Sequence, residues 1–303
     1  MADSVSWPAL PLAEWRDTYQ TLQLWTQIVG KVRLALSPWQ NHWWHVALYV
    51  NSRGLTTSPV PFRNSLFEIQ FDFLDHRLEI QTSDGGRQSL PLVAQSVAAF
   101  YAKFMAALGA LGITVAIETK PQEIADAIPF EQDTRHASYD PEYAHRFWRI
   151  LLSSAIVLNE FRSDFIGKCS PVHFFWGSFD LACTRFSGRP APPRKGVISG
   201  DAYSHEVISA GFWPGGGAID VPAFYSYTVP MPPGLPEARV RPAAAFWSTE
   251  LGEFILRYDD VRGAASPRAA LLEFLESTYV AGAELARWDR AALERQPTAH
   301  GAD

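Results

Sequence analysis

Within the segment Leu66–Phe73, apolar and polar side chains alternate from Phe67 onward. The apolar set comprises Phe67, Ile69, Phe71 and Phe73, and the polar set comprises Glu68, Gln70 and Asp72. A period of two residues is that of an extended strand whose two faces meet different surroundings. Strands of an all-parallel sheet are buried on both faces and are apolar throughout. The alternation therefore predicts an antiparallel sheet with one face packed on a core.

Apolar residues elsewhere recur at three- and four-residue steps, the spacing of one buried helical face. We predict helices over 13–36, over 91–111 with Pro91 in the first turn, over 140–165 and over 267–288. Asp140-Pro141-Glu142 combines a capping side chain, a first-turn proline and an acid near the helix N-terminus. Further strands are expected at 43–50, 55–58, 78–82, 113–118, 172–186, 203–210, 222–228 and 252–258.

The predicted order of helix, about four strands and helix occurs twice. We therefore predict an α+β fold in which a helix–four-strand antiparallel sheet–helix unit is duplicated, with two halves related by a pseudo-twofold axis. The first repeat would span 1–120 and the second, which carries the site, 121–303, in one compact unit. With the strand at 113–118 included, the second half has the order β-α-β4-α. An alternative fold is a single helix-grip-like sheet or a TATA-binding-protein-like saddle.

The distribution of charge argues against nucleic acid as a partner. Residues 1–120 carry nine basic and nine acidic side chains, so the whole net charge of −6 lies in residues 121–303. Proteins that bind a phosphate backbone without sequence preference need a basic surface. We expect no nucleic acid partner.

Membrane insertion and secretion are not expected either. No apolar run approaches the roughly 20 residues that a membrane-spanning helix needs. The first ten residues lack the basic start and apolar stretch of a signal peptide. The two cysteines, Cys169 and Cys183, provide no disulfide framework. A cytoplasmic location is the prediction, with Cys183 packed rather than reactive.

Several sequence signatures of common enzymes are missing. The chain has no GxGxxG before a helix, no Walker A lysine loop, no HExxH and no CxxC. Trp176-Gly177-Ser178-Phe179-Asp180 lacks the second glycine of a nucleophile elbow. The common dinucleotide, nucleotide and zinc-protease motifs therefore do not assign the chain to an enzyme class.

Three stretches differ from ordinary core sequence: DAIPFEQDTRHASYDPEY (126–143), HFFWGSFDLACTRFSGR (173–189) and AYSHEVISAGFWPGG (202–216). On these stretches the chain resembles a family filed as domain of unknown function 5996, and the resemblance covers nearly the whole chain. It implies that the protein is one unit. It supplies no activity, cofactor or partner.

His173, Asp180 and Arg185 lie close together in one of these stretches. Imidazole, carboxylate and guanidinium groups near one another suit an anionic ligand, since arginine can grip it with two hydrogen bonds. An Asp–Arg pair that braces a hairpin is the alternative interpretation.

His205 is expected on an otherwise apolar strand face, and Glu206 on the polar face. A buried histidine needs partners for both ring nitrogens. Backbone carbonyls could provide them, which would make His205 a core residue and Glu206 a solvated one. The other interpretation is that both belong to a functional site.

Three functions remain open. The first is a small-molecule-binding protein with an aromatic and polar pocket in the second half. Its candidate residues are His173, Trp176, Asp180, Arg185, His205, Glu206, Trp213 and Tyr225. The second is a hydrolase with a divalent metal held by His173, His205 and a carboxylate from Glu206 or Asp180. The third is a structural or scaffold protein in which these side chains are internal braces.

Overall fold

The computed structural model describes residues 7–296, which pack into two compact units. The first unit contains the described residues up to Ser153 and the segments His173–Leu181 and Trp213–Pro222. The second contains Ser154–Val172, Ala182–Phe212 and the described residues from Ala223 onward. The division expected at residue 120 was based on the repeated order of elements in the sequence. The two units are instead defined by packing, and they are not continuous in sequence, because two later segments belong to the first unit.

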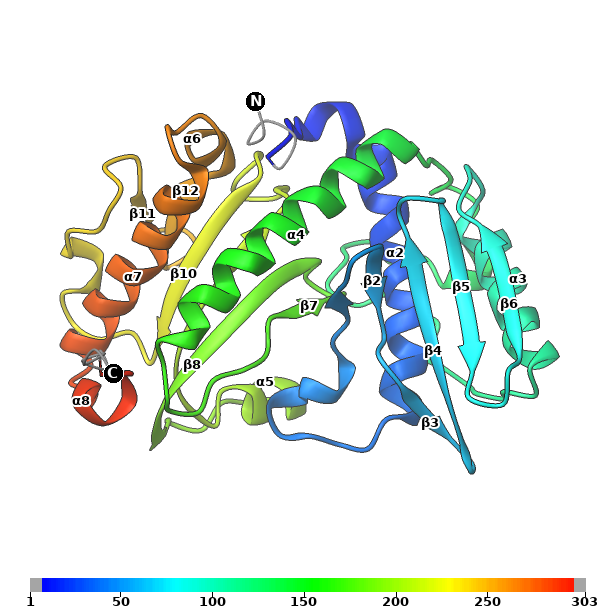
Figure 1. Ribbon diagram of the computed structural model, residues 1–303, viewed down its shortest axis with the longest axis horizontal. Helices are drawn as coiled ribbons and strands as arrows, with labels where there is room; N and C mark the ends of the chain where they lie inside the picture. Colours follow the sequence, from blue (N-terminus) through cyan, green and yellow to red (C-terminus); the bar gives the residue numbers. More distant parts are fainter. Residues whose placement is uncertain (1–6, 297–303) are drawn as a thin grey trace, which may run out of the picture. The chain divides into compact units, whose positions relative to one another are not determined.

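The first unit is a sheet with helices (Figure 1). Its elements are α2 (Leu12–Leu36), η1 (Asn41–Val46), β1 (Tyr49–Val50), β2 (Gly54–Thr56), β3 (Val60–Phe62), β4 (Ser65–Asp72), β5 (Arg77–Thr82), β6 (Arg87–Pro91), α3 (Val97–Ala110), η2 (Phe130–Gln132), the first part of α4 (Pro141–Ser163) and β7 (His173–Phe175). The strands follow the antiparallel order β1-β2-β4-β5-β6, and β3 also pairs with β4.

The alternating residues of β4 fill the core of the first unit. Ile69 pairs with Ile80 and Phe71 with Leu78 across β4 and β5, and all four side chains are buried. Trp25 of α2 stacks on Phe100 of α3 with ring centroids 4.6 Å apart. Burial of such large rings contributes most of the stability of a core.

The second unit combines a sheet with the C-terminal helices (Figure 1). Its elements are the last part of α4, most of β8 (Asp180–Pro190), α5 (Val197–Ala202), most of β9 (His205–Trp213), β10 (Ala223–Val229), η3 (Leu235–Glu237), β11 (Phe246–Ser248), β12 (Glu253–Arg257), α6 (Tyr258–Arg262), α7 (Pro267–Leu285) and α8 (Arg290–Leu293). Its strands follow the order β11-β12-β10-β9-β8.

Helix α7 packs closely on the sheet of the second unit. A side chain at Gly282 would meet Thr228 of β10 and Ile208 of β9, so the absence of one permits the close approach. Phe274 and Leu275 of α7 are fully buried. This packing fixes where α7 presents its polar residues along the second unit.

Mixed α+β structure with antiparallel sheets is confirmed. The helices expected at 13–36 and 140–165 are α2 and α4, and the alternating strand is β4. Asp140 caps α4 as expected, since its carboxylate accepts hydrogen bonds from the backbone N–H groups of Glu142 and Tyr143. Among the described residues, no helix has the length and apolar character needed to cross a membrane.

Three local predictions are wrong. The first half of 43–50 belongs to the short helix η1, and only Tyr49–Val50 is a strand. Within η1, His42 and Trp43 have φ of 59° and 61°, values outside the extended region of a strand. Pro91 ends β6, and α3 begins only at Val97, where the Ser96 hydroxyl accepts from the backbone N–H of Ala99. Residues 113–118 form no strand; the carbonyl of Glu118 accepts from the Lys31 ammonium, 2.9 Å away.

Candidate functional site

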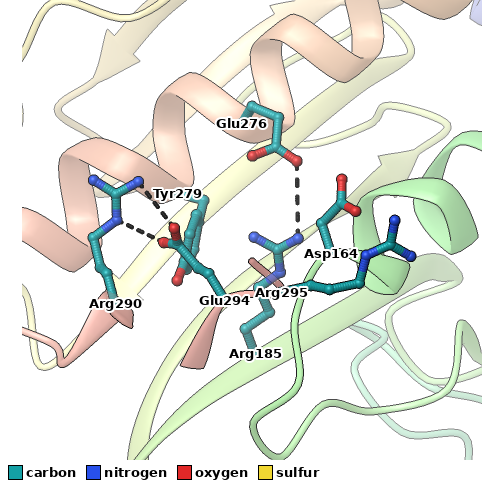
Figure 2. Close-up of a pocket in the computed structure, with 7 residues that line it drawn as sticks. All are labelled: Asp164, Arg185, Glu276, Tyr279, Arg290, Glu294 and Arg295. Atoms are coloured by element: carbon teal, nitrogen blue, oxygen red, sulfur yellow. Dashed lines mark hydrogen bonds and ion pairs between the residues drawn. The ribbon is translucent and has the colours of Figure 1, made fainter. Parts of the chain in front are cut away.

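A cavity of about 280 Å³ opens in the second unit (Figure 2). It is lined almost wholly by charged side chains, which come from four parts of this unit. The lining residues are Asp164, Arg185, Glu276, Tyr279, Arg290, Glu294 and Arg295. Small-molecule pockets are concave and usually mostly apolar with a few converging polar groups, whereas this cavity is concave but mostly charged.

The chain brings these residues together by local pairing. Arg185 projects from β8, and Glu276 and Tyr279 lie one helical turn apart on α7. Asp164 follows the last turn of α4, and its carbonyl accepts from the backbone N–H of Arg295, 2.9 Å away. A backbone bridge between Phe165 and Glu294 holds the segment after α8 against the end of α4.

Arg185 lies at the inner wall of the cavity and is only 1% exposed. Its guanidinium carbon is 3.4 Å from the ring centroid of Phe161, 4.3 Å from that of Tyr279 and 5.1 Å from that of Phe165. One terminal nitrogen donates to the carbonyl of Phe161, and Nε has no hydrogen-bond acceptor. A buried guanidinium without full hydrogen bonding is costly unless an anion compensates it.

Glu276 compensates this charge only weakly. Its carboxylate is 3.8 Å from the Arg185 guanidinium, which exceeds hydrogen-bond distance (Figure 2). Burial lowers the pKa of Arg185. Burial also raises the pKa of Glu276; Arg185 opposes this, and Asp164 and Glu294 add to it. Both shifts show that the surroundings disfavour the charged forms of the pair.

The remaining charges differ in how far they are neutralised. Arg290 is held by Glu294 at 2.6 Å and by Glu284 at 2.7 Å. Within residues 7–296, the side chains of Arg295 and Asp164 form neither a hydrogen bond nor an ion pair. The cavity therefore presents two incompletely paired cations, Arg185 inside and the exposed Arg295, together with two incompletely paired acids, Asp164 and Glu276.

Four of the residues predicted for the site belong to the first unit. His173 of β7 is 1% exposed and meets the rings of Trp44, Tyr49 and Phe175 edge-on at 5.3–5.7 Å. Trp176 is buried against Gly30, and its indole N–H donates to the carbonyl of Val46 at 2.8 Å.

The other two, Asp180 and Trp213, lie around Tyr19. Burial raises the pKa of Tyr19 to about 12, a hydrogen bond from Trp213 opposes this, and Asp180 adds to it. The Ser178 hydroxyl donates to Asp180. The four therefore lie in one unit, with Trp176 in a core position.

The other predicted residues belong to the second unit, where only Arg185 lines the cavity. Glu206 accepts hydrogen bonds from the Arg189 guanidinium at 2.6 and 2.8 Å and from Ser187. His205 is half-buried, with Ser204 Oγ 3.1 Å from Nδ1. Tyr225 stacks on Tyr227 with ring centroids 6.0 Å apart. Arg189 of β8 is thus paired with Glu206 of β9. The alternative interpretation expected Asp180 as the partner of an arginine in this part of the chain.

The metal-site prediction needs His173 and His205, which lie in different units. In the described part of the chain, no group of three or more His, Cys, Asp or Glu side chains could hold a metal ion. Neither unit by itself assembles the two imidazoles and a carboxylate, and the metal-dependent hydrolase stays a prediction.

Sequence reasoning found Arg185 but not its neighbours on and after α7. Glu276 and Tyr279 have the spacing of one helical face, next to the apolar pair Phe274-Leu275. This spacing is the sequence signal that could have indicated the site, because it places a glutamate at the edge of a buried helical face. Arg290, Glu294 and Arg295 follow the last long helix and resemble an ordinary charged terminus.

Comparison with known proteins finds a match to a family model. The chain matches no curated protein and no solved structure. The matched family is described as a family of unknown function, DUF5996, and its model covers residues 7–295. The resemblance read from the three sequence stretches is confirmed, and the chain belongs to this family.

Proposed function

We propose that the second unit binds a small anionic molecule, a carboxylate or phosphate compound, in the cavity at Arg185. The observation that carries the proposal is the buried guanidinium of Arg185, whose Nε has no acceptor and whose nearest carboxylate is 3.8 Å away. An anion in the cavity could accept from this guanidinium directly, and charge-assisted hydrogen bonds are among the strongest in proteins.

The size and walls of the cavity suit a small ligand. A volume of about 280 Å³ is near the lower end for small-molecule pockets. Phe161, Phe165 and Tyr279 hold the guanidinium plane from the protein side, which leaves its edge for the ligand. Arg295, at the exposed edge, supplies a second cation that attracts an anion toward the site.

A titration with sodium sulfate and with inorganic phosphate tests the proposal, with the melting temperature and calorimetric heat as readouts. Sodium chloride at equal ionic strength controls for general salt effects. The wild-type protein should be stabilised by sulfate, because a ligand of the folded state raises its stability. Arg185→Met, which keeps an apolar side chain of similar length, should lose this stabilisation.

The matched control is Arg268→Met, which removes an exposed arginine paired with Glu160 outside the cavity. It should respond to sulfate as the wild type does. Because Arg185→Met could fail to fold, Arg295→Gln provides a second variant at an exposed position and should weaken sulfate binding several-fold. Binding that is unchanged in both cavity variants would overturn the proposal.

The expected class of partner and the cellular location are inferred from the sequence and are part of the proposal. A small-molecule ligand, rather than nucleic acid or a membrane, agrees with the acidic excess of residues 121–303. A cytoplasmic location agrees with the two free thiols. Filter binding to DNA and RNA at low salt, and cell fractionation, test these statements.

We also propose that the two sheets with their helices descend from one duplicated unit. The repeated order of helix, strands and helix supports it, as does the sequential neighbour order β4-β5-β6 in one sheet and β8-β9-β10 in the other. Superposition of one sheet and its helices on the other tests the idea. If the helices crossed the two sheets at different angles, the proposed duplication would be contradicted.

A further inference from the structure

The two cysteines of the chain lie side by side in the second unit. Sγ of Cys169 and Sγ of Cys183 are 3.7 Å apart, and both are free thiols. Cys183 is fully buried in β8, whereas Cys169, in the segment before β7, is partly exposed. The chain has no other cysteine.

Backbone pairing sets this proximity. Cys169 and Arg185 are directly opposite each other in an antiparallel bridge, and the N–H of Ser170 donates to the carbonyl of Thr184 at 2.8 Å. Residues two apart on a strand share a face, so Cys183 and Arg185 both face the side of Cys169. The cysteines are thus a diagonal cross-strand pair, a relationship whose side chains reach each other.

The surroundings distinguish the two thiols. A hydrogen bond from Cys183 lowers the pKa of Cys169 against the effect of burial, and the charges of Arg185 and Arg162 act in the same direction. Cys183 has its pKa raised by the hydrogen bond to Cys169 and by burial. Cys169 is therefore the more nucleophilic and the more accessible thiol.

We propose that Cys169 and Cys183 are a redox-sensitive dithiol that a hydroperoxide oxidises to an intrachain disulfide. The inference rests on the geometry of the pair and is independent of anion binding at Arg185. Cys183 is packed, as expected, and the proposal adds a redox role for it.

The chemistry balances with hydrogen peroxide as the oxidant. The Cys169 thiolate attacks one peroxide oxygen, an S–O bond forms, the O–O bond breaks, and the departing hydroxide takes a proton to become water. Cys183 then loses its proton and attacks the Cys169 sulfenic sulfur; the S–S bond forms and the second oxygen leaves as water. Two thiols are oxidised and one peroxide is reduced to two waters.

Tryptic mass spectrometry of the full chain tests the proposal, because both cysteines fall in one peptide. Cleavage after Lys168 and after Arg185 releases residues 169–185, which contain no internal lysine or arginine. After peroxide treatment of the reduced native protein, this peptide should lose two hydrogen masses and both sites of alkylation. Dithiothreitol should restore both sites.

Two variants and a denatured sample make the result specific. Cys183→Ser should stop at a sulfenic acid on Cys169 that reacts with dimedone, and Cys169→Ser should keep its single thiol alkylatable. The same peroxide dose in guanidinium chloride should give much less disulfide, since the pair is then no longer held together. A disulfide-linked dimer, a sulfinic acid on Cys169 of the wild type, or equal oxidation of native and denatured protein would overturn the proposal.

Discussion

The guanidinium carbon of Arg185 lies 3.4 Å from the centroid of the Phe161 ring and 4.3 Å from the centroid of the Tyr279 ring. Cations over aromatic faces are stabilised by the ring quadrupole, most strongly where water is excluded. The rings therefore replace part of the hydration that Arg185 loses on burial, and they hold its plane in one orientation. In the proposed site, a guanidinium fixed in this way would bind a planar or tetrahedral anion without rearrangement.

Packing and charge at Arg185 can be separated by two substitutions. Arg185→Ala should lower the free energy of unfolding by about 2–4 kcal/mol, because it leaves a void among Phe161, Phe165 and Tyr279. Arg185→Met fills most of that space and removes a buried charge, so its loss should be under about 1.5 kcal/mol. Urea denaturation measures both. Equal losses would show that the charge, rather than the packing, supports the fold.

Sulfate binding should strengthen as the pH falls from neutral toward the ordinary glutamate pKa of about 4.3. Burial raises the pKa of Glu276, so Glu276 takes up a proton in the folded protein at a pH where an exposed glutamate is still ionised. Protonation removes the carboxylate that competes with the ligand for Arg185. An anion in turn favours the protonated form, so binding and proton uptake are linked in the same direction.

Glu276→Gln provides the control for this pH dependence, because glutamine imitates the protonated side chain and does not titrate. Its sulfate affinity should match the acidic value of the wild type and stay nearly constant over the same range. Calorimetric titrations at several pH values measure this. A wild-type affinity that rises with pH, or a variant with the same slope, would contradict the role of Glu276.

The N-terminal cap of α4 offers a separate test of how the sequence specifies its helices. Asp140 accepts from the N–H groups of Glu142 at 2.9 Å and Tyr143 at 3.2 Å. Asp140→Ala should cost about 1 kcal/mol of stability, whereas Asp140→Asn, which can still accept these bonds, should cost much less. Thermal unfolding of both proteins gives the comparison. If asparagine were no better than alanine, the charge of Asp140 would matter more than its hydrogen bonds.

The sequence predicted those elements in which periodicity and burial agree. Helix α4 and strand β4 each present one apolar face to a core, so the pattern and the packing coincide. Helix α2 also follows its apolar period, although it is buried on every side from Leu24 to Arg33. The segment 43–50 is apolar except for His45 and shows no regular alternation, and the positive φ angles of His42 and Trp43 decide its shape. Such angles are rare for residues other than glycine, and a pattern of hydrophobicity holds no information about them.

The cavity was only partly predictable for a related reason. Arg185 was a candidate because it lies close in sequence to His173 and Asp180, and a guanidinium can grip an anion with two hydrogen bonds. Its neighbours Glu276 and Arg295 lie about 90 and 110 residues later in the chain, and charged residues on a terminal helix usually face water. Contacts over such separations depend on the tertiary packing of α7, which local spacing does not report.

Gly30 in the middle of α2 should tolerate no side chain, although alanine normally favours a helix. A Cβ atom there would fall on the indole ring of Trp176, at a distance that packed atoms never show. Trp176 cannot move aside without breaking its 2.8 Å hydrogen bond to the Val46 carbonyl. Gly30→Ala should therefore lower the free energy of unfolding by about 3 kcal/mol or more.

Gly109 is the matched control in α3, where a Cβ would meet nothing within 4 Å, so Gly109→Ala should stabilise by about 0.5–1 kcal/mol. Chemical denaturation followed by tryptophan fluorescence measures both, and a neutral Gly30→Ala would show that the indole can repack.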